Sequence, residues 1–192
     1  MNERDTGSAS EQEAQWIRQI ADGDRRAFEK LYEVYGPRIF RFAIRMVKDE
    51  GKAEEVVDDV MFEVWKSAGR FEARSKPSTW ILGIARFRAL NAIRGKKLDT
   101  RGIDDDTPIA DPAEDAGEQL DRLTLAEQIK GALNDLSPEH REVVELTFFQ
   151  GCSYKEIADI AGCPEGTVKT RMYHAKRKLQ PILSAAVAGG SP

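Results

Sequence analysis

The chain has 192 residues, which at roughly 100–200 residues per domain allows one domain or two small ones. Apolar residues make up 41% of it and no apolar run approaches the ~18 residues of a membrane-spanning helix. The first fifteen residues are acidic and lack the apolar core of a signal peptide, so we expect no secretion and no membrane insertion. Two cysteines, Cys152 and Cys163, are too few for a disulfide framework, which favours a cytoplasmic protein.

Charge is segregated along the chain although the net charge is only -4. Residues 16–97 carry a net charge of +6 and residues 153–192 a net charge of +3, whereas residues 98–121 carry -8. Because attraction to phosphate acts over a Debye length of about 8–10 Å, these basic segments indicate nucleic-acid binding more strongly than the acidic pI argues against it.

The N-terminal part has helical periodicity throughout. Its apolar stripes are Phe28, Leu31, Tyr32 and Tyr35; Ile39, Phe42, Ala43 and Met46; Val56, Val57, Val60, Met61, Val64 and Trp65; and Trp80, Ile81, Ile84, Ala85 and Phe87. Gly36-Pro37 is expected to separate the first two runs. No segment alternates with a period of two, so we predict an all-α fold whose stripes are core, Trp80 and Phe87 included.

A helix before residue 70 carries a shared acidic flank of Glu55, Asp58 and Asp59 at i, i+3 and i+4. With no histidine nearby, catalysis and metal binding are poor explanations. A solvated face and a surface for a basic partner helix both remain open.

Basic and aromatic residues interleave over residues 70–97. Phe71, Trp80 and Phe87 lie among eight Lys and Arg residues, and residues 75–79, which include Pro77, are expected to form a loop that could hold an extruded base. Aromatic faces stack on unpaired bases while cations hold the backbone, so this segment is a candidate single-strand DNA site.

Residues 98–121 contain two Pro, two Gly and nine acidic residues without a helical stripe. This composition is typical of a flexible, solvated linker. We therefore predict two small helical domains, over residues 16–97 and 122–183, joined by an acidic linker over 98–121.

The C-terminal domain contains the most specific local pattern, a helix-turn-helix over residues 153–182. Ser153 and Glu156 form a capping box, Gly162 suits a left-handed C-cap, and Pro164 suits the first turn of a second helix. A helix beginning near Pro138 is expected to brace the pair.

The second helix of this motif is amphipathic in a way that fits a major groove. Its apolar seam is Val168, Met172, Ala175, Leu179 and Ile182, and its opposite face is Gly166, Thr170, Tyr173 and Arg177, flanked by Lys, Arg and His. Polar and basic side chains on one narrow face can contact base edges and phosphates. A solvated amphipathic helix is the plainer alternative.

Taken in order, four segments make the chain resemble the extracytoplasmic-function (ECF) sigma factors, which are promoter-specificity subunits of bacterial RNA polymerase. The similar segments are AFEKLYEVYGPRIFRFAIRMV, AEEVVDDVMFEVW, STWILGIARFRALNAIR and LSPEHREVVELTFFQGCSYKEIADIAGCPEGTVKTRMYHAKRKL. The resemblance covers residues 20–183. It implies an all-α protein with sigma region 2 at 16–97 and region 4 at 122–183, and no enzymatic activity.

Site roles follow from the resemblance by position. Residues implied to bind the coiled coil of the polymerase largest subunit are Glu55, Asp58 and Asp59. Residues implied to recognise the minus-ten element are Phe71, Arg74, Ser75, Arg86, Arg88, Asn91 and Arg94. Residues implied to read the minus-thirty-five element are Lys169, Thr170, Arg171, Tyr173, His174 and Lys176. His174 stands where Arg is common in the family, so its reach is shorter.

The implied partners are core RNA polymerase, through its coiled coil and flap, promoter DNA and an anti-sigma factor. No cofactor or metal is expected, because Cys152, Cys163 and the two histidines lack a zinc-ligand spacing. The alternative function is a polymerase-independent helix-turn-helix regulator. An enzyme with a DNA-binding tail would need a nucleophile or metal cluster in residues 16–97, where no histidine occurs.

Overall fold

A computed structural model describes residues 3–99 and 129–188 of the chain. Every regular element in these two ranges is a helix, which confirms the all-α prediction. The elements are α1 (Glu3–Ala21), α2 (Arg25–Val47), α3 (Glu50–Ser67), the short η1 (Ala68–Arg70), α4 (Pro77–Asp99), α6 (Pro138–Val144), η2 (Glu145–Phe149), α7 (Tyr154–Ala161) and α8 (Glu165–Ala188). Beyond residue 99, the predicted acidic linker falls outside the described residues.

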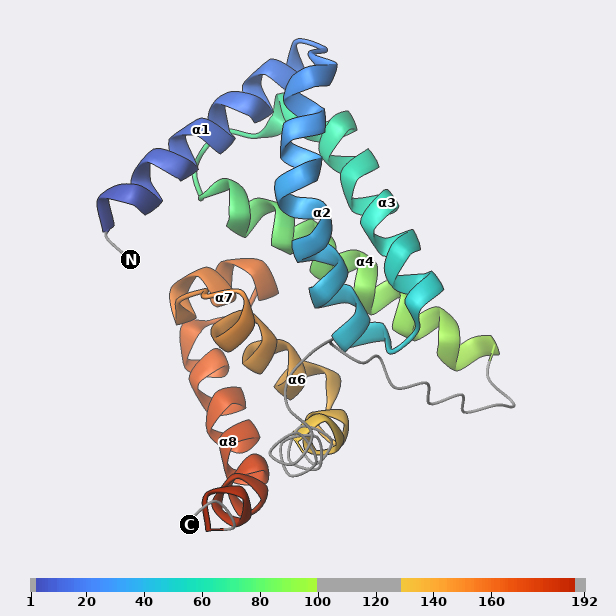
Figure 1. The fold of residues 1–192 in the computed structure, drawn as a ribbon, viewed down its shortest axis with the longest axis vertical. Coiled ribbons are helices and arrows are strands. Elements are labelled where there is room, and N and C mark those ends of the chain that lie inside the picture. The colour runs from blue at the N-terminus through green and yellow to red at the C-terminus, as the bar shows by residue number, and fades with distance from the viewer. Residues whose placement is uncertain (1–2, 100–128, 189–192) are drawn as a thin grey trace, which may run out of the picture.

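Helices α1 to α4 form an N-terminal module (residues 3–99) in which α2 and α3 lie side by side and α4 crosses behind them (Figure 1). Its core contains most of the predicted stripes, with Leu31, Tyr35, Ile39, Phe42 and Val60 fully buried. Tyr32, which was predicted to be core, is 40% exposed. Asp24 and Asp49 cap α2 and α3 through their side chains, which accept hydrogen bonds from backbone N–H groups of the first helical turn.

Helix α2 runs without a break through Gly36-Pro37, where we expected an interruption. Proline removes one N–H donor and its ring crowds the preceding turn, yet buried residues on both sides hold the helix together. A Cβ atom on Gly36 would lie 3.1 Å from the Tyr32 ring, so a larger residue there would require a small shift of that half-exposed side chain.

The C-terminal module (residues 129–188) is built around α6, α7 and α8. Ser153 and Glu156 form the expected capping box, and Gly162 ends α7 with φ 62° and ψ 38°. This is the left-handed conformation in which glycine avoids the steric cost of a Cβ atom. Pro164 directly precedes α8, so the helix-turn-helix forms as predicted.

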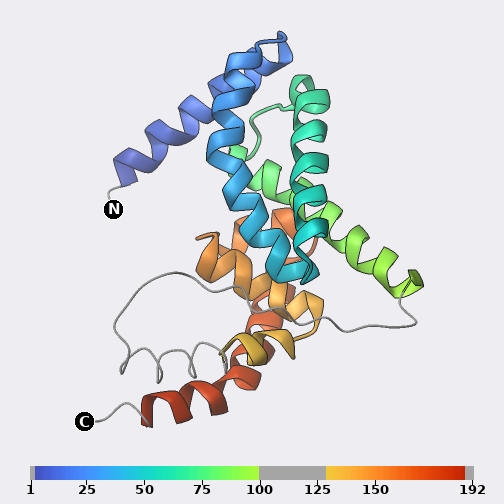
Figure 2. The ribbon, with the colours of Figure 1, turned by 45° about the vertical axis from the view of Figure 1, so that its right-hand side comes forward.

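The two modules pack against each other. The C-terminal module lies beneath the lower end of α2, and α7 contacts α4 (Figure 2). Arg38 on α2 donates hydrogen bonds from Nε to the Gln150 side chain at 2.8 Å and from Nη2 to its carbonyl at 2.9 Å. The structure thus brings two domains of the predicted kind into direct contact.

Candidate nucleic-acid interface

Helix α8 presents the predicted polar face to solvent. Val168, Met172 and Ala175 of the predicted apolar seam are buried, and α8 packs against α6 and α7. This packing fixes which side of the helix faces solvent. On the other side Thr170, Tyr173 and Lys176 are exposed, with Tyr173 60% accessible. The geometry therefore gives α8 the amphipathic form expected of a recognition helix, with these three side chains exposed to solvent.

The remaining candidates on α8 have neighbours within the module. Lys169 pairs with Glu165 one turn earlier at 2.8 Å between Nζ and Oε1. The His174 ring lies 5.9 Å from that of His140 on α6 and 5.5 Å from that of Tyr173. Arg171 is half-buried, and its Nη1 atom has no hydrogen-bond partner in the described structure.

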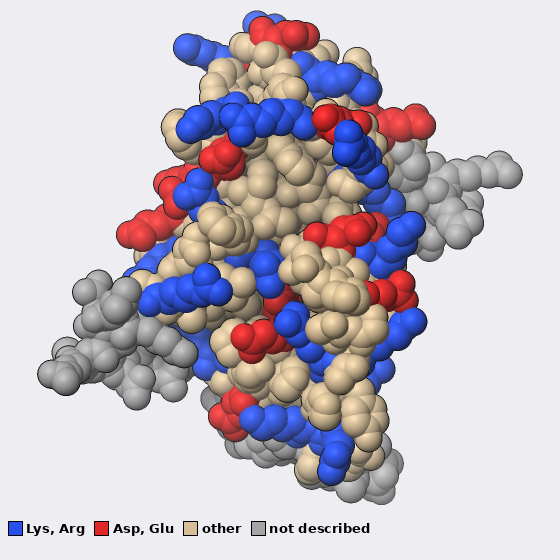
Figure 3. Space-filling view, turned by 180° about the vertical axis from the view of Figure 1, so that it is seen from behind, with Lys and Arg blue, Asp and Glu red and all other residues tan. Residues whose placement is uncertain are grey.

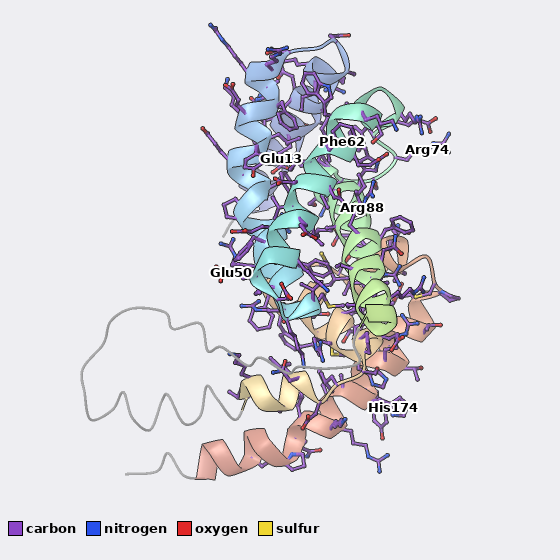
Figure 4. All side chains as sticks on the ribbon, turned by 90° about the vertical axis from the view of Figure 1, so that its right-hand side faces the viewer. Glu13, Glu50, Phe62, Arg74, Arg88 and His174 are labelled. Carbon is purple, nitrogen blue, oxygen red and sulfur yellow. The ribbon has the colours of Figure 1, made fainter. Side chains whose placement is uncertain are left out.

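Helix α4 begins at Pro77, so the loop predicted over residues 75–79 ends there, with Phe71 in the loop before α4 and Trp80 in the first turn of α4. Phe71 and Trp80 are both half-buried and their rings contact each other with centroids 5.1 Å apart. Arg74 is 85% exposed and pairs with Glu72 on the same loop. Figure 4 shows Arg74 at the outer edge of the N-terminal module and His174 on the C-terminal module toward the same side.

Phe87 is not a core residue, which corrects the sequence prediction. Its side chain is 59% exposed on α4, whereas Ile81, Leu82 and Ala85 on the same helix are fully buried. Phe87 lines a pocket of about 510 Å³ whose other residues are Glu63, Ser75, Thr79, Trp80, Gly83, Ile84, Arg88, Asp159 and Ile160. Since Asp159 and Ile160 belong to α7, this pocket is shared by both modules.

The candidate cations of α4 are in different surroundings. Arg86 forms an ion pair with Glu142 of the C-terminal module through its Nε atom. Arg88 lies between α3 and α4, 3.5 Å from Asp59 and 3.2 Å from Glu63 (Figure 4). Asn91 and Arg94 are exposed further along the helix. The structure therefore groups Ser75 and Arg88 at one pocket, while Arg86 faces the other module.

The acidic flank of α3 is exposed as expected. Glu55, Asp58 and Asp59 all face solvent, and the sequence prediction missed an apolar residue on the same side. Phe62 follows Glu55, Asp58 and Asp59 at the next i+7 position and is 64% exposed. The sequence prediction missed Phe62 because it lies among core residues in an apolar run. Its spacing of two helical turns from Glu55 was the signal that places it on the acidic side of the helix.

Two further acidic residues were missed by sequence reasoning. Glu142 and Glu145, in α6 and η2, have side chains that are only 1% exposed. Burial raises the pKa of both carboxyls, against the opposing attraction of Arg86 for Glu142 and of Arg45 for Glu145. Their signal in the sequence was the placement of two acids on either side of the apolar pair Val143-Val144, in the stretch EVVEL.

Lys and Arg side chains are distributed over both modules on the face seen from behind, with acidic residues between them (Figure 3). Within residues 3–99 and 129–188, no group of three or more His, Cys, Asp or Glu side chains could hold a metal ion. Among the helices described there, none is long and apolar enough to cross a membrane. The surfaces thus offer binding chemistry, namely cations, exposed aromatic rings and an acidic patch.

Both modules match models of known protein families. The family model for Sigma-70 region 2 matches residues 31–98, and that for Sigma-70 region 4 matches residues 126–179. RNA polymerase sigma factor CarQ of Myxococcus xanthus is 32% identical over 87% of this chain and 95% of its own length. RNA polymerase sigma-H factor of Pseudomonas aeruginosa is 30% identical over 92% of this chain and 98% of its own.

Two solved structures are similar in fold. CnrH, in complex with the cytosolic domain of CnrY, has a TM-score of 0.65 at 26% identity and covers 91% of this chain and 98% of its own. RpoE of Bartonella quintana, in complex with the anti-sigma factor NepR, has a TM-score of 0.64 at 31% identity, with 82% and 96% covered. The chain belongs to the ECF group of RNA polymerase sigma factors.

Proposed function

We propose that this protein is an alternative sigma factor that binds core RNA polymerase and directs initiation at a specific set of promoters. The observation that carries the proposal is the match to a sigma factor over 92% of this chain, in which region 2 comes first and region 4 follows. The role needs no chemistry of its own, since specificity comes from binding.

In this proposal α8 reads the minus-thirty-five element and the α4 region reads the minus-ten element. Lys169, Thr170, Arg171, Tyr173, His174 and Lys176 would contact the first element, and Phe71, Arg74, Ser75, Arg86, Arg88, Asn91 and Arg94 the second. Exposed Tyr173 and Thr170 support the first assignment, because they lie on the side opposite the buried seam. The Phe71–Trp80 ring pair beside the pocket supports the second, because aromatic faces stack on unpaired bases.

Polymerase binding is assigned to the acidic face of α3, formed by Glu55, Asp58 and Asp59. Phe62 at its end would add an apolar anchor, the arrangement that binding sites commonly use for a central contact. Asp59 also lies 3.5 Å from Arg88, so a change at Asp59 disturbs the proposed minus-ten surface as well. Asp58 is therefore the cleaner position for a test.

An anti-sigma factor is part of the proposal. The support is that the similar protein RpoE was solved in complex with the anti-sigma factor NepR, and that CnrH was solved in complex with the cytosolic domain of CnrY. A cytoplasmic location is also part of the proposal, because the proposed partners, RNA polymerase and promoter DNA, are in the cytoplasm.

The test is transcription in vitro from a cognate promoter with purified core polymerase. Asp58→Lys should weaken polymerase binding while leaving binding to a minus-thirty-five duplex unchanged. Arg171→Ala should do the reverse, with a loss of about 1–3 kcal/mol in duplex binding if it contacts a base. Equal defects of both variants in both assays would contradict the division of roles.

The alternative, a helix-turn-helix regulator that acts without polymerase, is favoured by the α7–α8 motif alone. This alternative does not explain the acidic face of α3 or the basic and aromatic surface of α4. Promoter opening by the chain in the absence of polymerase, or repression without a polymerase contact, would favour this alternative.

A further inference from the structure

Both histidines of the chain lie together on the C-terminal module. The sequence contains two histidines, His140 and His174. His140 is in the first turn of α6 and His174 is on α8, and their ring centroids are 5.9 Å apart. Because α6 and α8 pack against each other, the pair is a product of tertiary packing, and the sequence analysis assigned a role to His174 alone.

The pair lies on the solvent-facing side of α8. His174 is exposed at the edge of the C-terminal module (Figure 4), whereas Met172 and Ala175 on the other side of the helix are buried. The His174 ring contacts that of the exposed Tyr173, with centroids 5.5 Å apart and planes at 74°. His140 is half-buried. The rings of Tyr173, His174 and His140 therefore continue the proposed reading face of α8 onto α6.

The charged groups around the pair include both signs. On α6, Glu139 is exposed next to His140, and its pKa is lowered mainly by a backbone hydrogen bond, with smaller contributions from Arg171 and His140. On α8, Arg171 is half-buried, and Lys178 donates to a backbone carbonyl of the segment before α6. Charged groups on the other elements packed against α6 and α8 include Arg45 of α2 paired with Glu145 of η2, Glu156 of α7 paired with Lys76, and the exposed Lys155 and Asp159 of α7. A proton on the pair therefore has both acidic and basic neighbours, so an approaching anion can decide whether it binds.

Histidine and arginine offer DNA different chemistry at the position of His174. Arginine is charged at every physiological pH, whereas an imidazole is charged only when it is protonated, which ordinarily happens near or below about pH 6.5. A DNA phosphate beside an imidazole favours the charged form, because opposite charges at close range attract. Two imidazoles as close as these disfavour a second proton, because like charges repel. The pair is therefore suited to take up about one proton when a phosphate approaches.

We propose that His140 is a further DNA-contacting residue of the minus-thirty-five surface, and that it forms with His174 a phosphate-binding pair that takes up a proton when DNA binds. This inference rests on the proposed function, because that function makes α8 the helix that reads the element. Since the complex then holds more protons than the free chain, the affinity for DNA rises as the pH falls through the histidine range. A pair that only packed α6 onto α8 would titrate in the same way with and without DNA.

Proton NMR of the full chain tests the pair directly. Two histidines give few imidazole signals, which the single variants His140→Gln and His174→Gln assign. Both rings are titrated from about pH 8 to about pH 6, in the free chain and with a short duplex of mixed sequence at low salt, where phosphate contacts dominate binding. We expect the duplex to shift both ring signals and to raise the titration midpoint of the pair. A His140 signal that does not respond to the duplex would overturn its place on the surface, and an unchanged midpoint would overturn proton uptake.

Fluorescence anisotropy with the same duplex, labelled, measures the consequence for affinity. Relative to the double variant His140→Gln/His174→Gln, the wild type should bind roughly fivefold more tightly at about pH 6 than at about pH 8, as uptake of about one proton predicts. The comparison cancels the other titrating groups, because both proteins contain them. His174→Arg is charged at every pH and should bind at about pH 8 at least as tightly as the wild type does at about pH 6. Gln12→His, which adds a histidine on the exposed side of α1, is the matched control and should keep the wild-type profile.

The variants should fold, because Ser137 caps α6 through the backbone N–H of His140 and not through its side chain. Circular dichroism checks this, and the wild-type titration with and without duplex decides the proposal even where a variant loses its helical signal. A double variant with the same pH profile as the wild type would overturn the proposal. Failure of the proposed function is distinguishable, because the wild-type chain would then fail to bind core polymerase in a native gel while the histidine titration still responded to the duplex.

Discussion

Replacing Arg141 by methionine should unfold the C-terminal module at lower denaturant concentration than any exposed substitution of the same kind. Arg141 is 7% exposed at the start of α6. Its guanidinium donates to the carbonyls of Leu133, Asn134 and Leu136 at 3.0, 2.7 and 3.1 Å, and to that of Met46 at 3.4 Å.

The magnitude follows from what these carbonyls lose. Met46 is near the end of α2, where carbonyls have no partner within the helix. The Leu133 carbonyl would keep a backbone hydrogen bond from Leu136 at 3.3 Å, and the Asn134 carbonyl would keep one from Lys48 Nζ at 3.3 Å, so the loss is smaller than four separate bonds would give. A hydrogen bond from a charged donor contributes about 1.5–3 kcal/mol, and the four are not additive. Burial also lowers the pKa of Arg141, so methionine recovers part of a desolvation cost. We expect a net loss of about 2–4 kcal/mol.

Urea denaturation followed by circular dichroism measures this loss. A module of about 60 residues has a free energy of unfolding of roughly 3–9 kcal/mol, so the variant should be partly unfolded and should lose binding to a minus-thirty-five duplex. Arg177→Met, an exposed change on α8, serves as the control and should shift stability by less than about 0.5 kcal/mol. An Arg141→Met protein as stable as this control would refute the capping role.

Three further predictions concern buried groups. Because burial raises the pKa of Glu142 and Glu145 above 4.5, the folded state binds their protons more tightly than the unfolded state. The stability contributed by these two protonated carboxyls is therefore present in full below about pH 4.5 and is lost as the pH rises through their raised pKa values. Urea titrations at a series of pH values should show the free energy of unfolding of the wild type, relative to that of Glu142→Gln/Glu145→Gln, falling from about pH 4.5 toward neutrality. Burial also raises the pKa of the Cys152 thiol from 9.0 to about 11, so iodoacetamide should alkylate it about a hundredfold more slowly in the native protein than in urea, as mass spectrometry would measure. Tyr35→Phe removes a hydroxyl that donates to Glu13 at 2.7 Å and should lower the free energy of unfolding by about 1–2 kcal/mol in thermal melts; an unchanged melting temperature would show that α1 docks without this bond.

The local features of the fold could be predicted because they depend on neighbours in the chain. The capping box at Ser153, the left-handed Gly162 and the buried seam from Val168 each follow from spacing and conformational preference within two turns of a helix. The same holds for the exposed acidic flank of α3. These features set the helix-turn-helix and the orientation of α8 without reference to the rest of the molecule.

The features that could not be predicted depend on contacts between distant segments. Phe87 has the spacing of a core residue, yet its side chain is 59% exposed at a pocket that α4 shares with α7. Helix α2 passes through Pro37 because tertiary packing on both sides outweighs one missing hydrogen bond. Glu142 and Glu145 are buried because Arg86 and Arg45, about fifty and a hundred residues earlier in the chain, lie opposite them.

Charge segregation connects the predicted and the unpredicted parts. A basic, aromatic segment has the same sequence pattern whether its cations face phosphates or carboxylates, so the sequence can indicate an anionic partner without identifying it. In the docked chain, that partner includes Glu142 and Glu156 of the same molecule. Each of these contacts pairs a cation, Lys76 or Arg86, that the sequence pattern alone would leave available to phosphate.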